Sequence, residues 1–195
     1  MKHIFISGSM QIKNINKLVI DRIENIIREE FTILIGDADG VDSSIQQILS
    51  NNSYKNVIVY CTGNYPRNNI GKWEINTVHT EHALNTRAYF TAKDIEMAKK
   101  CDYGLMVWDS KSTGTLSNVY ELLLKKKTSV VFINKTKKFI TVSNPKGFEQ
   151  LVSNMSESAY EKASQKIKLK EKILAIKNEQ LSLFPKANNA VNLTA

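Results

Sequence analysis

The stretch Cys101–Leu124, CDYGLMVWDSKSTGTLSNVYELLL, decides the fold of this chain. Its first part, from Tyr103 to Trp108, is an almost wholly apolar run of strand length, and Asp109–Thr113 interrupts it with polar residues. From Gly114 onward the apolar residues recur at helical spacing. The pattern therefore predicts a buried strand, a polar loop and a helix, in that order.

The loop at this junction carries groups that suit an anionic or polyhydroxylated ligand. The first N–H groups of a helix lack partners inside the helix and lie at the positive end of its dipole, so phosphate or sugar oxygens bind there. Gly114 would let a ligand approach the main chain, and Ser112, Thr113 and Thr115 offer hydroxyl groups. An ordinary turn, in which Ser and Thr only cap the helix, is the alternative interpretation.

Earlier segments repeat the alternation of apolar strand and amphipathic helix. The predicted strands are Ile4–Ile6, Thr32–Ile35, Asn56–Cys61 and Tyr103–Trp108, and the predicted helices between them cover about 15–27, 41–49 and 91–101. In the last of these helices Ala92, Ile95, Ala98 and Cys101 form the expected apolar face. Such strands are typical of a parallel sheet covered on both faces. We therefore expect an α/β protein with a Rossmann-like three-layer fold and a mainly parallel sheet.

The remaining segments complete this domain and add an appendage. Residues 62–89 form an irregular loop, interpreted either as a lid over a site or as a surface excursion with Trp73 packed beneath it. After the opening stretch we expect a strand at Ser129–Ile133, a hairpin partner at Phe139–Val142 and a short helix after Pro145.

Three regions follow from this pattern. They are a nucleotide-binding domain at 1–154, a basic C-terminal helix at 155–179 and a flexible tail at 180–195. The basic segment is predicted to be one helix over Ser158–Asn178, because it contains neither Gly nor Pro. Its lysines are interpreted as a solvated face, with a nucleic-acid contact as the alternative.

Composition bounds the compartment and the partners. The net charge of +8 over 195 residues indicates an acidic partner such as a nucleotide, nucleic acid or an acidic protein surface. No apolar run of membrane-spanning length and no signal-peptide pattern occurs, so a cytoplasmic protein without membrane contact is expected. Cys61 and Cys101 are expected to be buried thiols. His79 and His82 are interpreted as polar surface, and neither a metal nor a cofactor is predicted.

Three polar loops are expected to meet at one edge of the sheet, because ligands of doubly wound folds bind beyond the carboxyl ends of the strands. The loops are Gly8-Ser9-Met10, Gly36–Asp42 and Asp109–Thr115. Glycines and hydroxyls suit phosphate, whereas the carboxylates of Asp37, Asp39 and Asp109 suit ribose hydroxyls or acid and base chemistry. Asp42 is interpreted as a helix cap. The sequence contains no Walker loop and no GxGxxG motif.

These loops resemble a family. Ser7-Gly8-Ser9, Gly36-x-Ala38-x-Gly40-x-Asp42 and Asp109-x-x-Ser112-x-Gly114-Thr115 are similar to the loop motifs of the SLOG superfamily, which includes DNA-processing protein A, Lonely-Guy-type phosphoribohydrolases and small bacterial proteins resembling YspA. The third loop also resembles that of nucleoside 2-deoxyribosyltransferases. The resemblance covers about residues 3–135. It implies a crevice that binds a nucleotide or nucleotide-derived ligand and a reaction that cleaves an N-glycosidic bond, and it leaves a homo-oligomer open.

The residues that the resemblance places around the ligand are Gly8, Ser9, Met10, Gly36, Asp39, Gly40, Ser112, Gly114, Thr115 and Asn118. The Lonely-Guy-type phosphoribohydrolases and the nucleoside 2-deoxyribosyltransferases both carry a catalytic Glu where this chain has Asn118. An amide is neither a nucleophile nor a base for cleavage of the N-glycosidic bond. Asn118 is therefore expected to hydrogen-bond ribose. Any catalysis would use Asp109, Glu121 or Asp37.

A second resemblance lies near the C-terminus. Gln180-Leu181-Ser182-Leu183-Phe184 is similar to the linear motif that docks polymerases and repair proteins on the bacterial sliding clamp. Leu183 and Phe184 would fill an apolar cleft, and Gln180 would add a directional polar contact. This resemblance implies a role at sites of DNA replication or repair. The alternatives are a tail folded back on the domain, a non-enzymatic adaptor that uses the domain as a scaffold, and a protein that touches DNA weakly or indirectly.

Overall fold

The computed structural model describes residues 1–183, and residues 179–183 by their backbone only. One seven-stranded sheet has the strand order β4-β3-β2-β1-β5-β6-β7, and all neighbours are parallel except the antiparallel pair β6 and β7. The strands are β1 His3–Gly8, β2 Thr32–Gly36, β3 Val57–Thr62, β4 Glu74–Val78, β5 Tyr103–Trp108, β6 Ser129–Ile133 and β7 Lys138–Val142. The predicted Rossmann-like fold and the predicted hairpin at β6 and β7 are confirmed.

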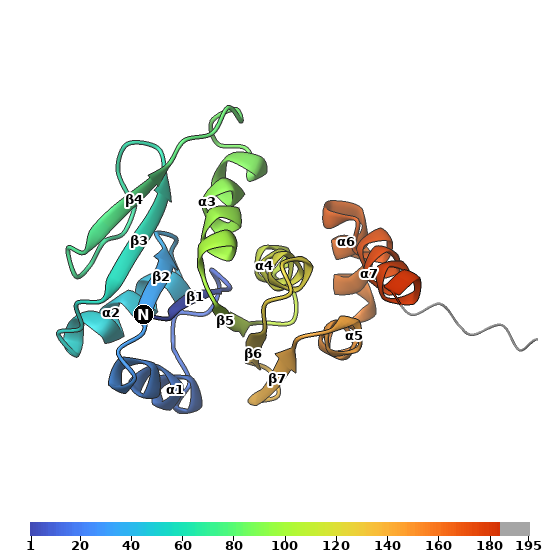
Figure 1. The fold of residues 1–195 in the computed structure, drawn as a ribbon, viewed down its shortest axis with the longest axis horizontal. Helices are drawn as coiled ribbons and strands as arrows, with labels where there is room; N and C mark the ends of the chain where they lie inside the picture. The colour runs from blue at the N-terminus through green and yellow to red at the C-terminus, as the bar shows by residue number, and fades with distance from the viewer. Residues whose placement is uncertain (184–195) are drawn as a thin grey trace, which may run out of the picture.

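Helices cover both faces of the sheet, which makes three layers (Figure 1). The helical layer on one face contains α1 Lys17–Arg28 and α2 Val41–Asn51. The helical layer on the other face contains α3 Arg87–Lys100, α4 Thr113–Leu124 and α5 Pro145–Val152. Beyond α4 and α5 lie α6 Glu157–Ile167 and α7 Leu169–Leu183, side by side (Figure 1).

The alternation of side chains along each strand divides the core in two. Ile4 and Ile6 of β1 pack into the cluster beneath α1 and α2, whereas Phe5 between them packs into the cluster beneath α3 and α4. β5 repeats the pattern, with Leu105 on the first face and Met106 on the second. Because both faces of the central strands are buried, these strands contain apolar runs such as Ile4–Ile6 and Leu105–Trp108.

Two helical predictions were wrong in detail. The helix expected from Thr91 begins at Arg87, where the Thr86 side chain accepts a hydrogen bond from the Tyr89 N–H. Its buried face contains Lys93 and Met97, while the predicted core residue Ile95 is 38% exposed. Ala98 and Cys101 are buried as predicted. The periodicity misplaced the rest of the face because that face includes a lysine, whose buried charge ion pairs compensate.

The predicted single helix over Ser158–Asn178 is in fact α6 and α7, joined at Lys168 in the left-handed conformation (φ 55°). The break allows Ala163 of α6 and Ile176 of α7 to reach the same core cluster. The backbone of α7 is described to Leu183, but side chains are described only to residue 178. The clamp-like motif at 180–184 therefore lies outside the residues whose side chains are described.

The loop expected at 62–89 contains the unpredicted edge strand β4, which pairs in parallel with β3. Trp73 just before it is buried, as the surface-excursion interpretation required, and its Nε1 donates a hydrogen bond to the Tyr54 carbonyl (2.7 Å). Cys61 and Cys101 are free and buried as predicted. Within residues 1–183, no helix is both long and apolar enough to cross a bilayer.

Candidate functional site

A cleft of about 730 Å³ opens beyond the carboxyl ends of β1 and β5. Strand order reverses between these two strands, since β2 follows on one side of β1 and β5 lies on the other. Of the predicted ligand-binding residues, those that line the cleft are Gly8, Ser9, Met10, Ser112, Gly114, Thr115 and Asn118. The loop after β1 and the start of α4 therefore meet as the topology predicts.

The second predicted loop contributes less directly. Asp39 and Gly40 line a separate pocket with Met10. Gly36 does not line the cleft, but a Cβ atom there would lie 2.4 Å from an oxygen of Asp42 and 2.6 Å from Nζ of Lys93. The absence of a side chain at Gly36 thus allows these two charged groups to pack over the end of β2.

Asp109 holds the loop between β5 and α4 in place. One carboxylate oxygen accepts a hydrogen bond from Ser9 Oγ (2.7 Å), and the other accepts the backbone N–H groups of Lys111 (2.9 Å) and Ser112 (2.6 Å). Both oxygens are therefore engaged by the protein. These contacts suit a residue that positions the loop, and the catalytic role predicted for Asp109 stays a prediction.

The first turn of α4 combines a cap with open space. Ser112 Oγ accepts hydrogen bonds from the backbone N–H (3.4 Å) and the hydroxyl (3.1 Å) of Thr115, as the capping interpretation required. A Cβ atom added at Gly114 would meet nothing closer than Ser112 Oγ at 3.9 Å, so the main chain is accessible there. Arg87 of α3 donates to Thr113 Oγ1 (3.0 Å) and brings a guanidinium to the same turn.

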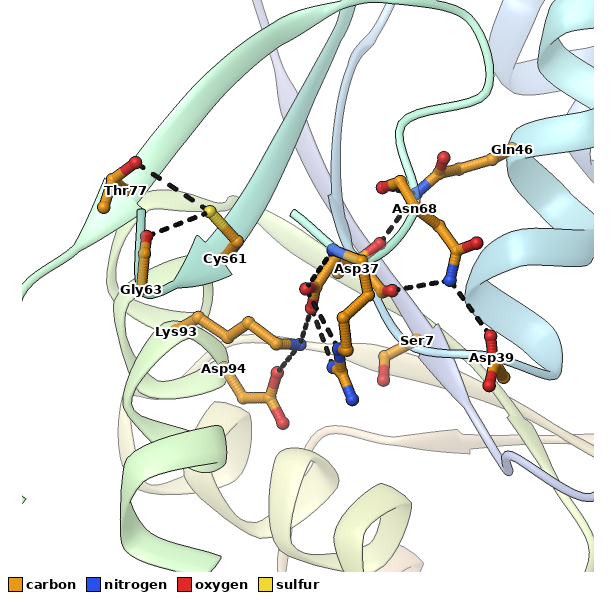
Figure 2. A network of polar contacts seen from close by, with 12 residues as sticks. Ser7, Asp37, Asp39, Gln46, Cys61, Gly63, Asn68, Thr77, Lys93 and Asp94 are labelled. Carbon is orange, nitrogen blue, oxygen red and sulfur yellow. Dashed lines mark hydrogen bonds and ion pairs between the residues drawn. The ribbon is translucent and has the colours of Figure 1, made fainter. Parts of the chain in front are cut away.

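A network of charged side chains adjoins the cleft, and Figure 2 shows its contacts. Asp37 accepts two hydrogen bonds from the Arg67 guanidinium (2.8 and 3.1 Å) and one from its backbone N–H (3.0 Å). Nζ of Lys93 lies between Asp37 (3.6 Å) and Asp94 (3.2 Å). Lys93 and Asp37 are both 4% exposed, so each compensates the other's burial.

Burial and charge separate the pKa values of the acidic groups. Burial, with smaller contributions from the charges of Asp94 and Asp37, raises the pKa of Asp42 to about 7, although the charge of Lys93 and the Ala38 N–H oppose the shift. Burial also acts to raise the pKa of Asp37, but the hydrogen bonds from Arg67 and the charge of Lys93 outweigh it and the pKa is lowered. Asp42 lines the cleft, whereas Asp37, predicted as catalytic, does not.

Residues 36–46 hold the loop after β3 through several hydrogen bonds. Asn68 donates to the carbonyl of Asp37 (2.9 Å) and to the carboxylate of Asp39 (3.1 Å), as Figure 2 shows. Gln46 accepts the N–H of Ile70 (3.0 Å) and donates to the carbonyl of Gly36 (2.9 Å). These contacts place Arg67 at the edge of the cleft.

Asn118 occupies the floor of the cleft. Its amide nitrogen donates to Ser7 Oγ (3.2 Å) and Asp94 (3.4 Å). Glu121, one turn further along α4, lines an adjacent pocket of about 220 Å³ and forms an ion pair with Lys125 (3.2 Å). Glu121 does not line the main cleft, although the two pockets share Asp94 and Asn118, and its catalytic role stays a prediction.

Several residues that line the cleft were not predicted as site residues from the sequence, namely Asp94, Arg67, Arg87, Phe90, Lys93, Lys162 and Lys166. None belongs to a motif, and the sequence pattern favours a solvated face for the lysines of α6. The one signal that could have found Lys93 is its spacing of four from Met97, which puts both on one helix face. Within residues 1–183, no group of three or more His, Cys, Asp or Glu side chains is arranged to hold a metal.

Comparison with known proteins identifies a shared fold. No family model matches the chain, and no curated protein matches it. Among solved structures, the chain is similar to the crystal structure of DNA processing protein A from Streptococcus pneumoniae, with a TM-score of 0.53 and 16% sequence identity. The similarity covers 78% of this chain and 56% of that protein. The chain therefore has a Rossmann-like fold of the type found in DNA processing protein A.

Proposed function

We propose that the cleft binds a nucleotide or a nucleotide-derived ligand. One observation carries the proposal: the accessible first turn of α4, with Arg87 bound to Thr113, opens into the same cleft as Asn118, Asp94 and Asp42. Helix N–H groups and a guanidinium suit phosphate. An amide and carboxyl groups suit ribose hydroxyls. A phosphorylated sugar could use both sets of groups, with its phosphate at the first turn of α4 and its hydroxyls at the amide and carboxyl groups.

Phe90 supplies an apolar surface beside these polar groups. It lines the cleft, and the guanidinium of Arg67 lies 5.2 Å from the centre of its ring. A planar base fits such a surface, because aromatic rings and guanidinium groups both stack on nucleobases. The proposed ligand therefore carries a base as well as a sugar and a phosphate.

Calorimetric titration with adenosine 5′-monophosphate, adenosine and inorganic phosphate tests the proposal. The nucleotide is expected to bind more tightly than either fragment. Arg87→Gln is expected to weaken nucleotide binding by about tenfold to a hundredfold, the effect of losing a charge-assisted hydrogen bond. Arg28→Gln, a change of the same chemistry on α1, serves as the control. Absence of binding by every common nucleoside monophosphate would overturn the proposal.

Cleavage of an N-glycosidic bond is the reaction that we propose for a bound nucleotide. In hydrolysis the oxygen of water bonds to C1′ as the bond from C1′ to the base nitrogen breaks. Water gives one proton to an ionised carboxylate and keeps the other as the new hydroxyl, while a protonated carboxyl group gives its proton to the leaving base. Transfer of the proton from the first carboxyl group to the second, through solvent, restores both. Asp42 and Asp94 support this proposal, because they line the cleft in different environments, as an acid and base pair requires. Asn118 would hold the ribose.

Chromatography of nucleoside monophosphates after incubation with the protein tests this reaction. Free base and ribose 5-phosphate are the expected products, and Asp42→Asn is expected to abolish their release. No release across the common bases would remove the hydrolase proposal and leave the binding proposal intact.

We propose that residues 180–184 recruit the protein to a sliding clamp. The support is the sequence QLSLF alone. Fluorescence titration of a labelled peptide spanning residues 178–186 against a bacterial clamp tests it, and binding that is unaffected by Phe184→Ala would count against the motif.

DNA contact is a further proposal, supported by the net charge of +8 and by the name of the structural neighbour. It predicts DNA binding that weakens steeply with salt. A non-enzymatic adaptor would instead show neither nucleotide binding nor base release.

A further inference from the structure

Helix α6 brings two lysines to the mouth of the nucleotide cleft. Lys162 and Lys166 are four residues apart and therefore project from one face of the helix, and both line the cleft. The other face of α6 packs inward through Ala159, Ala163 and Ile167, which are buried. The contact between α6 and α4 holds the lysines near the turn that begins α4.

Six basic and three acidic side chains line the cleft. A fourth carboxylate, Asp37, lies behind the cleft and pairs with two of the basic groups, Arg67 and Lys93. The cleft and this carboxylate together carry a net charge of +2 when all groups are ionised. Whether the cleft suits a second phosphate therefore depends on where its unpaired basic groups lie.

Four of these basic groups have no acidic partner in the described part of the chain. Arg67 and Lys93 are committed to ion pairs with Asp37. No carboxylate of residues 1–178 lies within 4.0 Å of the remaining four, which are Arg87, Lys111, Lys162 and Lys166. Arg87 and Lys111 belong to the turn at α4, whereas the two lysines come from the appended helix.

We infer that α6 forms a second phosphate subsite and that the ligand is a nucleotide with a diphosphate or longer polyphosphate chain. This inference rests on the proposed nucleotide-binding function. The phosphate nearest the ribose binds at the first turn of α4, with Arg87 and Lys111. The next phosphate binds Lys162 and Lys166, whose flexible side chains suit a point-charge contact rather than a bidentate one.

Calorimetric titration of the full chain with AMP and ADP tests the inference. The wild-type protein is expected to bind ADP at least about tenfold more tightly than AMP, the effect of one charge-assisted hydrogen bond. In the double variant Lys162→Gln, Lys166→Gln, the two nucleotides are expected to bind with similar affinity, while AMP binding changes less than about twofold.

The control variant Lys55→Gln, Lys100→Gln removes the same charge from exposed positions at the amino end of the sheet, at the start of β3 and the end of α3. It is expected to keep the preference for ADP. Equal affinity of the wild-type protein for AMP and ADP would overturn the second subsite and leave the proposed function standing. Loss of the preference in the control as well would also overturn it, because the effect would then reflect overall charge. Failure of both nucleotides to bind would overturn both.

A pyrophosphate-linked dinucleotide distinguishes the two sources of a diphosphate. NAD that binds as tightly as ADP would place an internal pyrophosphate across the two subsites, whereas a terminal diphosphate would favour ADP. Either result supports a diphosphate ligand, and weaker binding of both than of AMP contradicts it.

Discussion

Asp42→Asn is expected to stabilise the protein progressively as pH rises. Asp42 is 5% exposed, and burial raises its pKa from 3.8 to about 7. Between these pH values the unfolded chain has released the proton while the folded protein retains it. The free energy of unfolding therefore falls as pH rises through this window, and the full cost is present above pH 7. Asparagine has no charge to bury at any pH.

The magnitude follows from the pKa difference. Each pH unit between the unfolded and folded pKa values corresponds to about 1.4 kcal/mol, so the stability of Asp42→Asn relative to wild type is expected to rise by about 3 kcal/mol between pH 5 and pH 8. Any constant effect of the amide, such as its contact with the Ala38 N–H, cancels in this comparison.

Urea denaturation at both pH values, followed by circular dichroism, measures the effect. Asp37→Asn provides a control of opposite sign, since the pKa of Asp37 is lowered and its ionised form stabilises the fold above pH 3.8. Removing this carboxylate leaves Arg67 and Lys93 with one partner fewer and is expected to cost about 3 kcal/mol at pH 7. A stability difference between Asp42→Asn and wild type that does not change with pH would contradict the raised pKa of Asp42 in the folded protein.

Three further substitutions test the packing around the site. Lys93→Met is expected to cost about 3 to 5 kcal/mol in urea denaturation, because it removes the buried cation shared by the buried Asp37 and the half-buried Asp94; a neutral result would contradict the network. Gly8→Ala places a Cβ atom 2.4 Å from the Val107 carbonyl oxygen and is expected to lower stability by about 1 to 3 kcal/mol; an unchanged Tm would show that β1 and β5 separate freely. Lys168→Gly removes the cost of holding a residue with a Cβ atom in the left-handed conformation (φ 55°) and is expected to raise stability by up to about 1 kcal/mol, measured by thermal unfolding. Destabilisation would show that the lysine side chain stabilises the break between α6 and α7.

The sequence was sufficient to predict the sheet and the position of the crevice. A strand of a parallel sheet is buried on both faces and is therefore apolar along most of its length, as Tyr103–Trp108 is. The glycine turn after β1 and the Ser and Thr residues at α4 then had to meet at one edge of that sheet. Local chemistry and topology agreed at these positions.

The buried charges could not be predicted in the same way. A lysine such as Lys93 ordinarily lies at the surface because burying a lone ammonium is costly. Asp94 is its neighbour in sequence, but only the fold brings Asp37 within 4.0 Å of it. Asp42 resembled a cap, yet the N-cap of α2 is Gly40 and the Asp42 side chain faces the cleft. Such roles depend on contacts between residues that are distant in sequence.

The C-terminal helices show the same limit. A run of lysines is ordinarily a solvated face, and no Gly or Pro marked the break at Lys168. Packing of α6 on α4 brings Lys162 and Lys166 to the cleft, and the break lets α7 return to the same core cluster. Their contribution follows from packing between helices, which periodicity within one helix does not specify.

A crystal structure of the protein soaked with AMP tests the central claim most directly. We expect density for a phosphate with oxygens about 3 Å from the backbone N–H groups of Thr113 and Gly114 and from the Arg87 guanidinium, with the ribose toward Asn118. A nucleotide bound elsewhere, or a cleft that stays empty at a saturating concentration, would contradict it.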